Sequence, residues 1–98
     1  MIVYHIVLPE TWGAFTGDLY RAASLDAEGF IHCSFEEQLE AVIDRYYGGM
    51  RSIIVLEVDS DKLMSRLVHE PSTNKEVYPH IYGPINRAAI ISAVERHL

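Results

Sequence analysis

Apolar and polar positions along the chain predict short strands separated by turns. Residues 2–8 form a run rich in β-branched side chains that stops at Pro9, as expected of a strand. The run Ser52–Asp59 is apolar enough to predict a central strand buried on both faces. Residues 77–82 are again extended, although Pro79 lacks the N–H of a ladder hydrogen bond and favours an edge strand or a bulge. The pattern is that of a strand-rich domain.

The remaining segments give weaker signals, each shorter than a typical helix or strand. They predict a helical turn at 10–15, a short strand or loop at 19–25, a turn at 26–29, a short apolar strand at 30–33, a turn or short helix at 59–64, a strand at 66–70 and a loop at 71–75.

One helix has a well-defined predicted start. Ser34 and Glu37 fit a capping box, in which the hydroxyl accepts a bond from an early helix N–H and the carboxylate reaches back. Apolar residues then recur at helical spacing as far as Tyr46, and a pair of glycines ends the run. Near the C-terminal end, Asn86 is a candidate cap for either one helix or a helical turn followed by a strand. We favour the turn and the strand.

Taken together, these elements predict one compact α+β domain spanning residues 1–98. Strands outnumber the one secure helix, so the expected architecture is a split, mostly antiparallel sheet with one main helix packed on it. The chain contains no internal repeat and no low-complexity tract that would indicate a linker.

Charge and composition narrow the classes of partner. Eight Lys and Arg residues against fourteen Asp and Glu give a formal net charge of -6, and the basic residues are scattered. Long nucleic acid is therefore not an expected ligand, because its non-specific binding needs clustered cations. No apolar run approaches the roughly 20 residues that span a bilayer. The start of the chain lacks the basic region of a signal peptide and enters a strand pattern at once, and the lone Cys33 fits a reducing compartment, so we expect a cytoplasmic protein.

Histidine is the main clue to function. The chain has five in 98 residues, and His5, His32 and His80 each interrupt an apolar run. An imidazole can act as general acid or base, ligate a metal or hydrogen-bond a substrate. His32 lies just before Ser34, where the N–H groups of a helix start would attract a phosphate or carboxylate. The alternative for each of these residues is a structural histidine that is hydrogen-bonded within the core.

Three further candidates lie near the third histidine. Tyr78 and Tyr82 share the face of His80 if this segment is extended, which would make an aromatic wall for a planar ring. The alternative is a rigid loop with no ligand. Glu70 would either orient a histidine or serve as the acidic member of a site, although a surface glutamate is the more common case. Cys33, in an apolar strand, is expected to be inert core.

Two kinds of chemistry lack a sequence signature. The histidines and the cysteine do not have the spacing of a zinc site, so no metal is predicted, although a site assembled by folding from the three histidines remains an alternative. There is no Gly-x-Ser-x-Gly motif for a serine hydrolase, and Ser34 fits a capping role.

The segments Glu28–Ser34 and Tyr78–Pro84, with Tyr4-His5-Ile6 at the start, closely resemble the bacterial domain of unknown function 952 family. The resemblance covers nearly the whole chain. At the level of fold, that family is similar to a minimal ADP-ribosyltransferase-like domain, the architecture of NAD-cleaving transferases and tRNA 2′-phosphotransferases. Function does not follow from fold, but the resemblance gives a concrete hypothesis.

The resemblance implies a histidine-lined cleft that binds NAD or another phosphorylated ribose nucleotide. His5 would take the first site position and bond the ribose hydroxyls, and His32 the second, near phosphate or ribose. His80 or Glu70 would take the third. As the acidic residue, Glu70 would stabilise the positive charge that develops as nicotinamide leaves.

The same resemblance also implies roles for three further residues. Ser34 would assist at the phosphate, and Tyr78 or Tyr82 would stack on the base. The competing hypothesis is a non-catalytic module that binds another small molecule or a protein partner. The distance of Glu70 from the histidines separates the two, because a remote carboxylate could not stabilise the reacting sugar.

Overall fold

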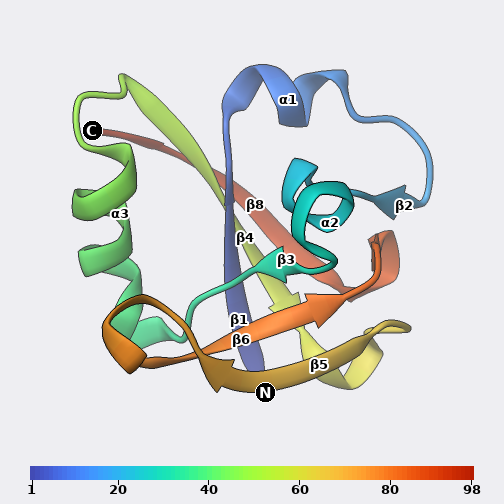
Figure 1. Cartoon of the computed structure of the whole chain (residues 1–98). Helices are drawn as coiled ribbons and strands as arrows, with labels where there is room; N and C mark the ends of the chain where they lie inside the picture. The colour runs from blue at the N-terminus through green and yellow to red at the C-terminus, as the bar shows by residue number, and fades with distance from the viewer.

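Three small antiparallel sheets and one main helix make up the computed structural model, which describes residues 1–98 (Figure 1). The first sheet has the order β1–β4–β8, with β1 at Ile2–Val7, β4 at Ser52–Asp59 and β8 at Ile90–His97. The second pairs β2 (Leu19–Tyr20) with β7 (Ile85–Asn86). The third has the order β3–β6–β5, with β3 at Ile31–His32, β6 at Val77–Tyr82 and β5 at Arg66–Pro71.

The main helix is α3 (Leu39–Tyr47), and the other helical segments are short. They are α1 (Pro9–Ala14), α2 (Ala23–Glu28) and the 3-10 turns η1 (Glu36–Gln38), η2 (Ser60–Lys62), η3 (Thr73–Lys75) and η4 (Arg87–Ala89). The predicted α+β class, with antiparallel sheets and one main helix, is confirmed. None of these helices is long and apolar enough to cross a membrane.

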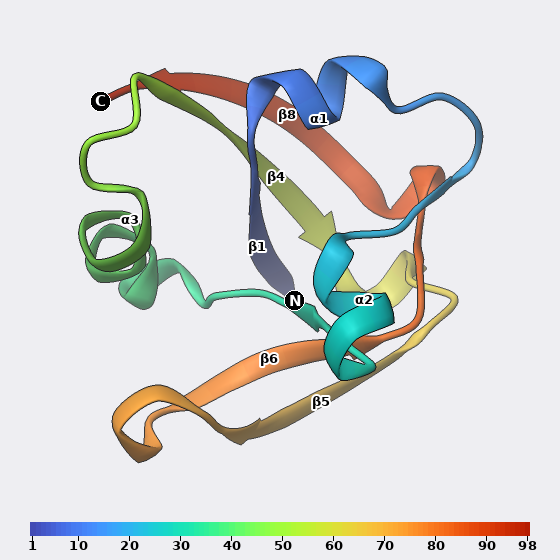
Figure 2. The same ribbon diagram turned by 45° about the horizontal axis from the view of Figure 1, so that its top comes forward.

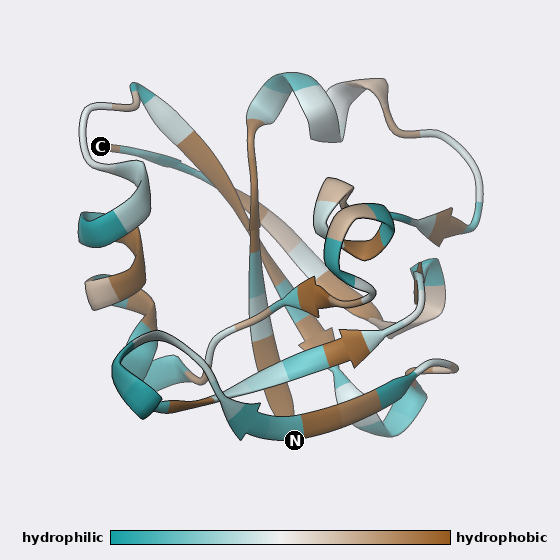
Figure 3. Ribbon diagram, in the orientation of Figure 1, coloured by the Kyte–Doolittle hydropathy of each residue, from teal (hydrophilic) through white to brown (hydrophobic).

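Strand β4 is buried on both faces, as its apolar run predicts. On one face, Leu56 and Val58 join Val3 and Val7 of β1 in the larger core cluster. On the other face, α3 covers a second cluster. The members of that cluster are Ile6, Leu39, Ile43, Ile53 and Val55. Figure 3 shows the two ends of β1 and much of β4 as apolar ribbon at the centre of the molecule.

The start of the helical region differs from the predicted capping box. Phe35, not Ser34, is the N-cap residue, and its N–H donates to Oε1 of Gln38 at 3.0 Å. Ser34 stays extended because it forms a β-bridge with Tyr4, with N–H to O distances of 2.8 and 2.9 Å. The prediction with Ser34 and Glu37 is therefore wrong by one residue, because pairing with β1 holds Ser34 outside the helix.

The region between β1 and β3 holds a helix that the sequence pattern did not predict. Residues 19–25 were expected as a strand or loop and 26–29 as a turn, but the strand ends at Tyr20 and α2 follows. Gly29 ends this helix in the left-handed conformation (φ 91°), which glycine adopts without strain. None of the residues of this helix is buried, so its sequence lacks the strong apolar periodicity from which a helix is predicted.

Strand β6 lies in the middle of its sheet, so the expectation of an edge strand at Pro79 is wrong. The carbonyl of Pro79 accepts the N–H of Cys33 at 3.1 Å, on the side of β3. Because the N and C=O of one residue point to the same edge of a strand, the missing N–H also faces that side, just where β3 ends at His32. The proline therefore disrupts little of the ladder.

The C-terminal prediction is confirmed. Asn86 precedes the turn η4, and the final strand β8 follows. The Asn86 side chain does not cap the turn; its amide donates to the carbonyl of Lys62 and its oxygen accepts the N–H of Met64. These bonds tie the end of β7 to the segment that leads into β5.

Candidate functional site

A cavity of about 510 Å³ lies among β1, the start of α2, β3, α3 and the tip of the β5–β6 hairpin. In Figure 1, α3 and α2 stand on opposite sides of β1, and β3 runs between them. Figure 2 shows the β5–β6 hairpin on the same side of the molecule as α3. A cavity of this size suits a small molecule of nucleotide dimensions.

Five of the six tyrosines line this cavity. They are Tyr4, Tyr20, Tyr46, Tyr47 and Tyr78. No Asp, Glu, Lys or Arg side chain is among its 18 lining residues. The wall is therefore aromatic and carries no formal charge other than any borne by its histidines, which favours a planar ring stacked among phenol groups.

His5 is buried in the wall with both ring nitrogens engaged. Nδ1 lies 2.7 Å from the carbonyl oxygen of His32, and Nε2 lies 3.0 Å from the hydroxyl of Tyr20. A carbonyl only accepts, so Nδ1 carries the proton and Nε2 accepts from Tyr20. Burial lowers the pKa of His5 to about 4, so the ring is neutral near pH 7.

Tyr20 holds its place through an aromatic cluster. Its ring meets Phe15 and Trp12 edge-on, with centroids 5.5 and 5.8 Å away. Burial raises its pKa to about 12, so the hydroxyl stays protonated and donates to His5. The oxygen of Tyr20 retains acceptor capacity toward the cavity. A ligand hydroxyl can therefore bond the oxygen of Tyr20, whereas both nitrogens of His5 already have partners.

His32 lines the cavity with a side chain that is 47% exposed. Its Nε2 lies 2.9 Å from a carboxylate oxygen of Glu28, four residues earlier at the end of α2. His32 is thus oriented by a carboxylate and open to solvent, which is the arrangement of a histidine available for proton transfer or for ligand binding.

Ser34 and Cys33 are both buried residues of the cavity wall. The Ser34 hydroxyl forms no hydrogen bond within the protein, and the backbone N–H of Ser34 donates to the carbonyl of Tyr4. The helical region starts one residue further on, with Phe35 as its N-cap, so Ser34 does not cap the helix start at which an anion site is predicted. Burial raises the pKa of Cys33, and the thiol is expected to be unreactive, in agreement with its predicted core role.

His80, Glu70 and Tyr82 form a separate cluster beside the cavity. Nδ1 of His80 lies 2.7 Å from Oε1 of Glu70, and the hydroxyl of Tyr82 donates to the same oxygen. These hydrogen bonds lower the pKa of Glu70, that from Tyr82 most, and keep the carboxylate ionised. The ring of His80 lies 5.4 Å from that of His32, its partner across the β3–β6 pairing.

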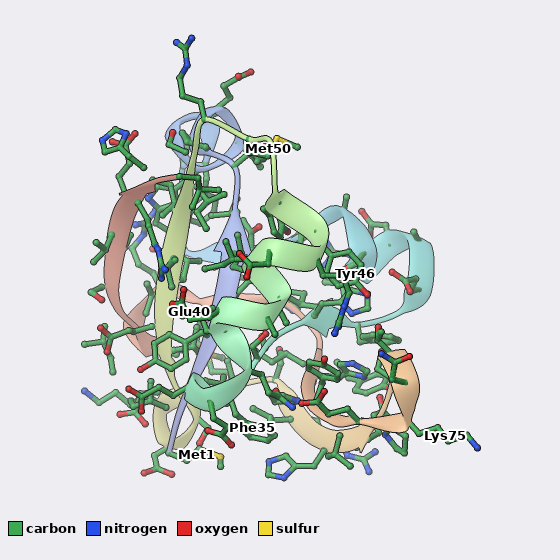
Figure 4. The ribbon with its side chains drawn as sticks, turned by 90° about the vertical axis from the view of Figure 1, so that its left-hand side faces the viewer. Met1, Phe35, Glu40, Tyr46, Met50 and Lys75 are labelled. Atoms are coloured by element: carbon green, nitrogen blue, oxygen red, sulfur yellow. The ribbon has the colours of Figure 1, made fainter.

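Tyr46, which is exposed, and Tyr78, which is buried, both line the cavity near α3. Arg45 donates to the hydroxyl of Tyr78 at 3.3 Å, and its guanidinium lies 5.7 Å from the ring centre of Tyr46. The hydroxyl of Tyr46 lies 2.7 Å from Oγ1 of Thr73 in the β5–β6 loop. Figure 4 shows Tyr46 on the flank of α3, whereas Lys75 points away from the molecule.

The predicted residues thus divide into two groups. His5, His32, Ser34 and Tyr78 line the cavity. The other three, Glu70, His80 and Tyr82, form the adjacent cluster. The sequence analysis did not identify the other four tyrosines of the wall as site residues. Their spacing in the chain forms no motif, and the tyrosine content of the chain is the only signal that points to them. No group of three or more His, Cys, Asp or Glu side chains is arranged to hold a metal ion.

The fold and the cavity define a small α+β protein with an aromatic ligand-sized site. Residues 6–93 match the model of the DUF952 family, described as a protein of unknown function, and the chain belongs to this family. It is similar to protein CC0527 from Caulobacter crescentus, whose crystal structure superposes with a TM-score of 0.84 at 26% identity, over 97% of this chain and 85% of that one. The solution NMR structure of CC0527 gives a TM-score of 0.83 at 26% identity, over 99% and 85%. No curated protein matches the sequence.

Proposed function

We propose that the cavity binds a ribonucleotide, with NAD as the first candidate, through its planar ring and the attached ribose. The observation that carries this proposal is the wall of five tyrosines without any carboxylate, lysine or arginine. Aromatic faces stack well on a heteroaromatic ring, and a cationic nicotinamide ring would gain further from phenol faces. The resemblance to ADP-ribosyltransferase-like domains supports NAD as the ligand to test first.

The ribose would be recognised by neutral hydrogen-bonding groups. Tyr20 and Ser34 line the cavity and carry hydroxyl groups, and His32 adds an imidazole. His5 acts through Tyr20, since both of its own nitrogens have partners within the protein. This differs from the expected direct bond between His5 and the ribose.

The phosphates would lie beside Arg45, whose guanidinium contacts two lining tyrosines, Tyr46 and Tyr78. Arg45 has no carboxylate within salt-bridge distance. A guanidinium in that position can accept a phosphate in bidentate fashion without breaking an ion pair.

Binding is better supported than transferase chemistry. Glu70 does not line the cavity, and its carboxylate is committed to His80 and Tyr82. A carboxylate in that position is not available to stabilise a reacting sugar in the cavity. The second candidate function, a non-catalytic binding module, is favoured by this same observation.

The test is ligand binding by calorimetry and thermal shift with NAD, ADP-ribose and nicotinamide riboside. The matched variants are Tyr46→Leu and Tyr82→Leu, since both side chains are exposed but only Tyr46 lines the cavity. We expect Tyr46→Leu to weaken NAD binding by about fivefold, or about 1 kcal/mol, and Tyr82→Leu to leave it unchanged. Equal effects of the two variants, or no binding at millimolar ligand, would contradict the proposal.

The Arg45→Gln variant distinguishes the contribution of the ligand's phosphates to binding from that of its ring. It should weaken binding of NAD and ADP-ribose but not of nicotinamide riboside, which has no phosphate. A similar loss for all three ligands would mean that Arg45 supports the cavity wall and does not contact phosphate.

A further inference from the structure

Among the buried side-chain nitrogen and oxygen atoms, one has no hydrogen-bond partner, and it belongs to His80. Nε2 of this ring is shielded from solvent and forms no hydrogen bond, while the residue as a whole is 3% exposed. Buried side-chain nitrogens nearly always have a partner, so an exception calls for a functional explanation.

The hydrogen bond at the other ring nitrogen, Nδ1, determines the tautomer of His80. Nδ1 lies 2.7 Å from the ionised carboxylate of Glu70, which only accepts, so Nδ1 carries a proton. In the neutral form of the ring, the free electron pair therefore lies on Nε2. A carboxylate that holds the tautomer and stabilises the imidazolium is the arrangement that activates a histidine as a base.

Phe30 covers this ring. Its side chain stacks on His80 with centroids 4.1 Å apart and planes at 18°, and it also contacts His32 at 4.8 Å and Tyr82 at 5.4 Å. Phe30 follows Gly29, the left-handed residue that ends α2, so it lies in the short link into β3. His32, which lines the cavity, lies beside both rings.

We propose that Glu70 and His80 form a general-base pair beside the cavity, and that Nε2 of His80 takes the proton of a hydroxyl group once the side chains packed around the ring, Phe30 among them, move aside. In this step the O–H bond breaks, the proton binds Nε2, and the electron pair remains on the oxygen, which becomes the nucleophile. The positive charge on the imidazolium is balanced by Glu70. The inference rests on the proposed function for the source of the hydroxyl, which is the ribose or a water beside it.

The first experiment requires no ligand. Protein labelled with 15N in histidine should give, by long-range proton–nitrogen NMR near neutral pH, an unprotonated Nε2 and a protonated Nδ1 for His80. A resonance showing a proton on Nε2 would overturn the proposal. Glu70→Gln should change this signature at His80, and Glu28→Gln, the matched change at the neighbouring histidine, should change only His32.

The second experiment measures access to Nε2. Diethyl pyrocarbonate acylates free imidazole nitrogens, and peptide mapping would follow each histidine separately. Phe30→Ala, with Phe30→Leu as a milder change, should accelerate modification of His80 several-fold and leave the exposed His97 unaffected. No acceleration in either variant, once both are shown to be folded, would mean that Phe30 does not cover a reachable base.

The third experiment separates this inference from the proposed function. Addition of NAD to the labelled wild type should shift the Nε2 resonance of His80. Binding without such a shift would overturn the inference and leave the proposed function standing. If NAD does not bind, the proposed function fails, and the NMR and acylation results still decide whether His80 is an accessible base.

Discussion

The hydroxyl of Tyr20 lies 3.0 Å from Nε2 of His5 and joins two sheets at the wall of the cavity. Tyr20 belongs to the β2–β7 pair and His5 to the β1–β4–β8 sheet. Because the other nitrogen of His5 donates to the carbonyl of His32, a third sheet meets at the same ring. The imidazole thus fixes the relative position of three sheets, and its protonation would remove the acceptor that Tyr20 needs.

Acid should therefore destabilise the protein through His5. Its pKa is lowered from 6.5 to about 4, chiefly by burial, so the unfolded chain binds the proton at a higher pH than the folded one. This contribution to stability is complete above about pH 6.5 and is lost as the pH falls toward about 4, by on the order of 3 kcal/mol. Urea denaturation across this range measures it. His5→Gln, which does not titrate there, should show a flatter pH dependence; an equally steep one would assign the effect to other groups.

Tyr20→Phe tests the same contact from the other side. The variant keeps the aromatic packing against Trp12 and Phe15 but leaves Nε2 of His5 buried without a donor. We expect a loss of about 1 to 3 kcal/mol in the free energy of unfolding near neutral pH. Tyr82→Phe, which removes a hydroxyl from an exposed tyrosine, is the control and should cost less.

Gln38 should be as important to the fold as an apolar core residue. Its buried amide accepts the N–H of Phe35 and donates to Glu76 at 2.9 Å and to the carbonyl of Val77 at 2.7 Å. Gln38→Glu removes both donated bonds and places a second carboxylate beside Glu76. We expect a loss of roughly 2 to 4 kcal/mol by chemical denaturation. Gln38→Glu with Glu76→Gln should recover part of this loss, and no recovery would show that the bond to Val77 dominates.

Gly83 should not tolerate a side chain. A Cβ at this position would overlap Oγ of Ser65 and lie 2.9 Å from its Cβ, and the Ser65 hydroxyl donates to the carbonyl of Pro84. Gly83→Ala is expected to lower the melting temperature by several degrees, through steric overlap and an unfavourable φ of 155°. Ser65→Gly in the same chain removes the overlapping atoms and should restore part of the stability. If it does not, backbone strain at Gly83 is the main cause.

The bond between Tyr46 and Thr73 joins two residues that line the cavity. Both groups are at the surface, so Thr73→Val should change the free energy of unfolding by less than about 1 kcal/mol. It should instead speed amide hydrogen exchange in the β5–β6 loop and ligand release. Thr11→Val, in helix α1 and outside the cavity lining, is the matched control. Unchanged exchange would show that the loop holds its position without this bond.

The sequence by itself determined most of the strands. Strand β4 could be predicted because its apolar run is local and is buried whichever strands flank it. The final turn and strand after Asn86 also followed from local chemistry. Helix α2 was missed because its burial pattern is weak, and the helix cap shifted to Phe35 because a β-bridge to Tyr4 holds Ser34 extended.

The candidate site was determined only in part by sequence. The residue types that carry chemistry could be named from local sequence, and His5 and His32 do meet at one cavity. Which partner each takes depends on strand register: the β3–β6 pairing sets His32 opposite His80, and the β5–β6 pairing brings Glu70 within reach of His80. The wall of tyrosines comes from strands, a helix and a loop that are far apart in the chain. Only the packing of those elements decides that these rings face one space, because no local pattern encodes a contact between distant segments.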